Sequence, residues 1–201
     1  MNYLAHICLA KMTETDLVGN FMGDFVKGSE LDRFDTPIQH GIHLHRKIDV
    51  FTDQYYKETH ISTHFPLHLR RTSYLCLDVY FDYLLIKHWE QFSNLPLNTL
   101  LDEFYDSLAT FEQPLENRFD KVRQSLLSRR WLKSYASIDT IKNVLIHIEN
   151  RFSRPLLFAV ESVDIMHRNP QVERTFLTFF PLLIHHTQRQ ALSITSSNDS
   201  M

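Results

Sequence analysis

Hydrophobic residues recur along most of the chain at intervals of three and four positions, which is the period of one face of an α-helix. Prolines, glycines and short polar runs interrupt this pattern and mark the ends of the predicted helices. We expect helices over residues 3–11, 15–27, 37–53, 67–92, 97–111, 138–150 and 154–167, a short helix ending near Pro66, one that Pro114 opens, and a long last helix from residue 170. No repeat or linker interrupts the series, so the predicted fold is all-α, a single compact helical bundle.

Several predicted helix ends carry typical capping residues. Asp16 and Thr36 stand where N-caps are expected, Pro37 suits the first helical turn, and Gly28 suits the position after a helix. Pro181 lies inside the last helix and is expected to kink it. We expect residues 1–192 to form the helical domain and the Ser-rich residues 193–201 to be a disordered tail.

Composition agrees with a folded helical protein. The chain has 43% hydrophobic and 22% charged residues but only four glycines, too few for the turns of a β-sandwich or for a Gly-rich phosphate loop. A net charge of −3 argues against nucleic acid as a partner, and no apolar run reaches the roughly 18 residues of a membrane span. The absence of a secretory leader and two cysteines in apolar runs predict a cytoplasmic protein with free thiols.

Polar residues interrupt the apolar faces of three predicted helices, of which residues 67–92 form the central one. In each helix two polar residues lie four positions apart and therefore share a face: Asp78 with Asp82, His45 with Asp49, and Asn20 with Asp24. Burying such a carboxylate costs roughly several kcal/mol unless a cation, a proton or hydrogen bonds compensate it.

Carboxylates and an imidazole delivered from separate helices can form a cage for a divalent metal. Oxygen ligands with a minority of nitrogen favour Mn²⁺ or Mg²⁺ over Zn²⁺, and neither Cys8 nor Cys76 belongs to a Cys-x-x-Cys pair. The Glu-x-x-His motif of di-iron carboxylate bundles is absent from the sequence, which favours hydrolysis over oxygen chemistry. The alternative interpretation is structural: His45 can be a hydrogen-bonded core histidine, and the two aspartates of the central helix can pair with arginines, namely Arg46, Arg70 or Arg71.

A set of short motifs in the first 93 residues resembles the acyl carrier protein phosphodiesterase family. The motifs are MNYLAH at 1–6, GN at 19–20, DFVKG at 24–28, GIHLHRKID at 41–49, TD at 52–53, LDV at 77–79, Asp82, and HW at 88–89. Weaker similarity continues at Trp131-Leu132 and at Phe180-Pro181.

The resemblance implies an all-helical, Mn²⁺-dependent phosphodiesterase. Such an enzyme removes the 4′-phosphopantetheine arm from the serine of holo-acyl carrier protein, an acidic protein substrate, and leaves the apo form. It also implies a distant likeness to the HD-type phosphohydrolases, although this sequence has no His-Asp doublet and Tyr83 follows Asp82. Two further hypotheses stay open: an HD-like phosphohydrolase of nucleotides or other small phosphoesters, and a helical interaction module without enzymatic activity.

Helix geometry and the family motifs coincide on the same candidate site residues. The expected metal ligands are Asp24, His45, Asp49, Asp78 and Asp82. Arg46 is a candidate to neutralise charge on the phosphoryl group, and His6 or His88 a candidate to protonate the departing serine oxygen. Asp53 and Asn20 are expected to lie behind the ligands and orient them.

Four basic clusters are candidates for the surface that binds the acidic carrier: Arg70-Arg71, Lys121 with Arg123, Arg129-Arg130 with Lys133, and Arg151 with Arg154. Binding depends on the local charge that faces the partner more than on net charge. Each cluster can equally be an ordinary solvated helix face.

Overall fold

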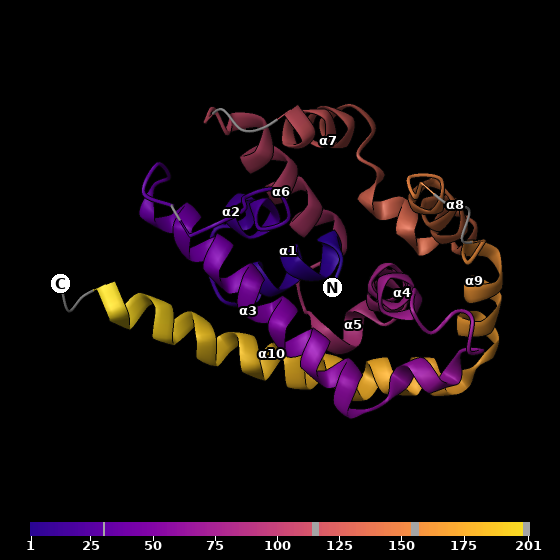
Figure 1. Ribbon diagram of the computed structural model, residues 1–201. Coiled ribbons are helices and arrows are strands. Elements are labelled where there is room, and N and C mark those ends of the chain that lie inside the picture. Colours follow the sequence, from indigo (N-terminus) through magenta and orange to yellow (C-terminus); the bar gives the residue numbers. More distant parts are fainter. Residues whose placement is uncertain (30, 114–116, 154–156, 199–201) are drawn as a thin grey trace.

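The computed structural model describes residues 1–29, 31–113, 117–153 and 157–198, and every regular element among them is a helix. Figure 1 shows their arrangement, and the all-α prediction is confirmed. The α-helices are α1 Tyr3–Met12, α2 Leu17–Met22, α3 Thr36–Glu58, α4 Ser73–Lys87, α5 Trp89–Phe92, α6 Leu97–Thr110, α7 Asn117–Arg129, α8 Ile138–Glu149, α9 Ala159–Arg168 and α10 Pro170–Asn198, with 3₁₀ helices η1 Ile61–His64 and η2 Trp131–Ala136.

Two helices form the interior of the bundle. In α4 the side chains of Cys76, Leu77 and Phe81 are fully buried, as the sequence predicts for the central helix. Helix α1 is equally buried, since every residue from Leu4 to Ala10 lies inside the core. Figure 1 shows α3 and α10 on one side of this pair and α6 and α7 on the other. The first turns of α1 are therefore held deep inside the protein.

Several predicted helix boundaries are wrong, and local interactions explain them. Helix α2 ends at Met22 instead of near residue 27, because the chain turns at Gly23. The predicted helix 67–92 begins only at Ser73 and divides at His88 into α4 and α5. The expected helix starts at Pro114 and residue 154 lie outside the described residues.

Helix α10 runs beside α3 for much of its length (Figure 1). Aromatic rings join the two helices: Tyr55 lies 4.6 Å from Phe179 and Phe51 lies 4.2 Å from His186, both measured between ring centroids. As predicted, Pro181 lies inside α10. The helix continues to Asn198, past the start of the predicted tail at residue 193.

Helices α2 and α3 approach each other closely at glycines. A Cβ atom on Gly41 would lie 2.5 Å from the backbone nitrogen of Asn20, and one on Gly19 would lie 2.6 Å from the carbonyl oxygen of Ile38. Both neighbours are backbone atoms, so no side-chain rotation can relieve the clash. This contact fixes the distance between Asn20 and α3.

We expect the substitution Gly41→Ala to lower the free energy of unfolding by about 1–3 kcal/mol, because the added methyl group forces α2 and α3 apart. Urea denaturation followed by circular dichroism measures the change. Val50→Ala, at an exposed position of the same helix, is the matched control and should stay close to the wild type. Equal midpoints for Gly41→Ala and the wild type would contradict the close packing.

Candidate metal centre

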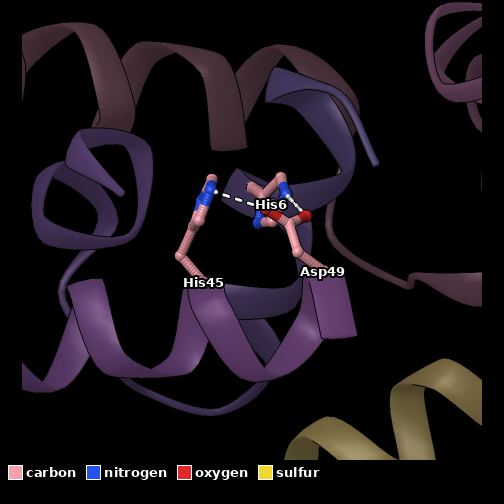
Figure 2. A group of neighbouring side chains, drawn as sticks. All are labelled: His6, His45 and Asp49. Atoms are coloured by element: carbon pink, nitrogen blue, oxygen red, sulfur yellow. Dashed lines mark hydrogen bonds and ion pairs between the residues drawn. The ribbon is translucent and has the colours of Figure 1, made fainter. Parts of the chain in front are cut away.

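Three side chains from α1 and α3 converge at the centre of the protein. Nε2 of His6 lies 3.1 Å from Oδ1 of Asp49, and Nε2 of His45 lies 3.1 Å from Oδ2 of the same carboxylate. Figure 2 shows Asp49 beside the two imidazoles, with dashed lines that mark its contacts to His6 and to His45. Within the described part of the chain, this is the one group of three potential ligands whose donor atoms all lie within 4.8 Å of one another.

The local helix geometry explains this convergence. His45 and Asp49 are one turn apart on α3, and both face α1, where His6 occupies the buried side. The two imidazole rings stack with centroids 3.8 Å apart. Gly23 makes room for this arrangement, because a Cβ atom at that position would lie 2.1 Å from Cγ of His45. Any side chain at residue 23 would displace the His45 ring.

Asn20 orients His6 from behind. Its Oδ1 lies 3.1 Å from Nδ1 of His6, and both residues are almost completely buried. Since the amide oxygen can only accept, Nδ1 carries the proton and Nε2 presents a lone pair toward Asp49. Asn20 therefore contacts the ring nitrogen of His6 that faces away from Asp49.

The donor set fits a bound cation. A lone pair on Nε2 of His6 faces a carboxylate oxygen, also an acceptor, so a positive charge between them removes the repulsion. Burial, and secondly the charge of His45, lowers the pKa of His6 to about 4, so this imidazole is neutral at pH 7, as a metal ligand must be. Burial alone would raise the pKa of Asp49, but a hydrogen bond from His45 and the nearby imidazole of His6 hold it well below its usual value.

Asp24 and Asp78 border this group. Oδ1 of Asp24 lies 3.8 Å from Nε2 of His45, and about a third of its side chain is exposed. Oδ1 of Asp78 lies 3.1 Å from the amino group of Met1 and accepts a hydrogen bond of 3.1 Å from the hydroxyl of Tyr56. Burial would lower the pKa of that amino group, but Asp78 and Asp49 raise it to about 10. The amino group of Met1 therefore forms ion pairs with both Asp49 and Asp78.

Asp82 is not brought to the cluster. Its two carboxylate oxygens accept hydrogen bonds of 3.0 Å from the backbone nitrogens of Leu4 and Ala5, at the N-terminus of α1. The unpaired amides and positive dipole end of a helix attract a carboxylate, which accounts for this position. Burial raises the pKa of Asp82 to about 7, although the two amides oppose the shift. Asp82 thus holds the first turn of α1, where His6 directly follows Ala5, against α4.

The remaining predicted site residues lie around or outside the group. Arg46 is partly exposed and donates a hydrogen bond of 3.1 Å to the carbonyl oxygen of Val26. Asp53 is exposed, one turn along α3 from Asp49. His88 forms an ion pair with Glu173 of α10, so its ring joins α5 to α10.

Three residues of the basic clusters identified in the sequence are engaged in local structure. Arg70 donates to the carbonyl oxygen of Phe65, and Arg123 donates to the carbonyls of Leu108 and Ala109. Arg130 forms an ion pair with Asp102. Arg154 lies outside the described residues.

The acyl carrier protein phosphodiesterase family matches residues 1–183 of the chain. The chain belongs to this family. Acyl carrier protein phosphodiesterases of Salmonella paratyphi A, Salmonella agona and Salmonella newport are each 33% identical to it over 195 residues, which cover 96% of this chain and 100% of each relative. No solved structure matches the chain. The predicted family is thus confirmed.

The site of this family member contains two residues whose roles the sequence did not predict. His6 was expected to be a proton donor, but it joins His45 and Asp49 as a potential ligand. The sequence pattern predicts no role for Gly23, which provides the space for the His45 ring. The MNYLAH motif was a signal for His6, whereas the role of Gly23 follows only from the packing of α2 on α3.

Gly23→Ala should lower the affinity of the protein for Mn²⁺ by about 10- to 100-fold, the range found when residues that orient metal ligands are changed. The backbone at Gly23 has φ −53° and ψ −31°, which alanine adopts readily, so helix content should persist. Calorimetric titration of the metal-free protein measures the affinity. Wild-type affinity in this variant would show that the His45 ring is not needed for binding.

In the metal-free protein, His6 should make stability depend on pH. Its pKa is 6.5 in the unfolded chain and about 4 in the fold. As the pH falls from 6.5 to 4, the unfolded chain therefore binds a proton that the folded protein does not, and about 3 kcal/mol of stability is lost. His6→Gln should lack this loss. Denaturation curves between pH 7 and pH 4 test it, and parallel pH profiles for the two proteins would refute it.

Proposed function

We propose that the protein is a metal-dependent phosphodiesterase that hydrolyses the bond between the serine oxygen and the phosphorus of holo-acyl carrier protein. The products are the apo protein with a free serine and 4′-phosphopantetheine. Family membership supports the substrate, since the Salmonella relatives are named acyl carrier protein phosphodiesterases. The observation that carries the proposal is the His6, His45 and Asp49 group, whose donor atoms lie close together in the interior.

His6, His45 and Asp49 are the residues that would hold the metal ion. Two imidazoles and one carboxylate suit Mn²⁺ better than Mg²⁺, which prefers oxygen ligands. When bound, the ion polarises a phosphoryl oxygen and lowers the pKa of water. Asp24, near His45 and partly exposed, is the residue that we propose to extend this ligand set or to hold the attacking water.

Other residues of the chain would orient these groups and balance charge. Asp49 holds both imidazoles, Asn20 fixes the proton of His6 on Nδ1, and the amino group of Met1 positions Asp49 relative to Asp78. Arg46 follows His45 on α3 and is partly exposed, which supports its proposed role beside the anionic phosphodiester. Asp53 is exposed and does not belong to the group formed by His6, His45 and Asp49, so we place it outside the ligand set.

The same site and family lead us to propose a cytoplasmic enzyme, where its protein substrate would be found. No helix in the described ranges combines the length and the apolar character that crossing a bilayer requires. Cys8 and Cys76 are buried free thiols, as expected in a reducing compartment.

We expect the wild-type protein with Mn²⁺ to remove the prosthetic arm from holo-acyl carrier protein, which mass spectrometry detects as the loss of mass from the carrier. A chelator should abolish the reaction and added Mn²⁺ should restore it. Asp49→Asn should reduce kcat/KM by more than about 100-fold, because it removes a ligand that also positions both imidazoles. Asp106→Asn, at an exposed position of α6, is the matched control and should retain activity.

Other outcomes would identify a different function. Hydrolysis of nucleotides with no change in the carrier would favour the small-phosphoester hypothesis. Binding of the carrier without hydrolysis, and folding that is insensitive to chelator, would favour an interaction module. Full activity in Asp49→Asn would remove this residue from the site.

A further inference from the structure

The outer faces of α3 and α10 carry a concentration of positive charge. Residues 36–48 of α3 contain Arg46 and Lys47 but no acidic residue, and residues 174–198 of α10 contain Arg174 and Arg189 but no acidic residue. The two helices lie side by side (Figure 1). Neither segment belongs to the basic clusters that the sequence suggested.

Contacts between the helices bring charges from both together. The His186 ring stacks on Phe51 of α3 at 4.2 Å. Its pKa is lowered by partial burial and then by the positive charges of Arg189 and Lys47, so a cation from each helix lies close to this ring. His43, whose pKa is lowered by burial and then by Arg46, His40 and Lys47, lies on the same side of α3.

These cations are available to a partner. His43, Lys47 and Arg189 are exposed, and none of them forms an ion pair within the part of the chain that the structure describes. Two exposed apolar side chains lie among them: Val50 is 65% exposed and Leu182 is 49% exposed. Apolar contacts surrounded by charges are typical of a protein-binding surface. We call these residues, namely His43, Lys47, Val50, Leu182, His186 and Arg189, the α3/α10 surface.

The α3/α10 surface adjoins the solvent-exposed side of the proposed metal centre. Because successive helix residues are about 100° apart, these positions around α3 follow the order Asp49, Asp53, Arg46, Val50, His43, Lys47. The side chain of Asp49 is 43% exposed, so solvent reaches the site from this side of the helix. A typical interface covers about 800 Å² on each partner, so its edge lies about 16 Å from its centre. Helix α3 is only about 10–12 Å wide. A protein whose phosphodiester enters the site would therefore cover the α3/α10 surface.

We propose that the α3/α10 surface binds the acidic face of the carrier protein around its modified serine. This inference rests on the proposed function, because the substrate must present its serine at the metal centre while the rest of the carrier lies on the enzyme. Lys47 and Arg189 attract the acidic side chains, and Val50 and Leu182 provide the apolar contact. Long-range attraction of this kind accelerates association and weakens as salt screens the charges.

The test is a double charge reversal, Lys47→Glu with Arg189→Glu. The matched control is Lys121→Glu with Arg129→Glu, which makes the same change in net charge at two exposed positions of α7. KM and kcat for holo-acyl carrier protein are measured at low and high ionic strength. Hydrolysis of bis(4-nitrophenyl) phosphate, which has no protein surface to bind, reports whether the metal centre is intact.

We expect the α3/α10 double variant to raise KM for the carrier about tenfold or more at low salt, with kcat within twofold of wild type. The decline of wild-type kcat/KM with salt should be largely lost in this variant, and turnover of the small phosphodiester should persist. The α7 control should keep wild-type KM and salt dependence. Equal KM values for the two double variants would overturn the proposal while leaving the proposed function intact.

A direct binding measurement separates this proposal from the enzymatic one. If the wild type does not cleave the carrier, the proposed function fails, and calorimetric titration with holo-acyl carrier protein still tests the surface. Loss of binding in the α3/α10 variant but not in the α7 control would support the surface. Equal binding by both variants, or no binding by the wild type, would overturn it.

Discussion

Each oxygen of the Asp49 carboxylate lies 3.1 Å from Nε2 of one imidazole, His6 or His45, and the packing of α1, α2 and α3 brings these groups together. An isolated carboxylate in the interior would be costly. Asp49 is stabilised by a hydrogen bond from His45 and by the amino group of Met1, and a divalent cation would add to this stabilisation. The arrangement suits metal binding, because neutral imidazoles and an ionised carboxylate are the forms that bind metals.

The position of the first turns of α1 and the close contact between α2 and α3 determine where these side chains lie. Asp82 accepts hydrogen bonds from two backbone amides and so holds the N-terminus of α1 against α4. These bonds fix how deeply the start of α1 lies in the core and which way His6 points. Gly19 and Gly41 allow α2 to approach α3, which brings Asn20 behind His6, and Gly23 leaves space for the His45 ring. Small residues and a buried carboxylate therefore determine the geometry of the metal centre without belonging to it.

The proposed site and the α3/α10 surface share one helix. The side of α3 that faces α1 carries His45 and Asp49, and its exposed side carries His43 and Lys47. A single rigid element can therefore bind the phosphodiester and the protein that presents it, which couples recognition of the carrier to the position of the reacting bond. The net charge of −3 does not prevent this, since charge is concentrated locally by tertiary packing.

The sequence by itself determined the all-helical fold, the central helix and the family, because helical periodicity and short motifs are local properties of the chain. It also identified His45, Asp49 and Asn20, whose spacing of four residues or place in a motif marks a buried helix face. Only the tertiary structure decided that His6 joins them, that Asp82 binds the start of α1, and that Gly23 must lack a side chain. It alone brought Lys47 and Arg189 together from distant parts of the chain. Spacing within one helix fixes which side chains share a face, whereas the partner of that face depends on how helices pack across the whole chain.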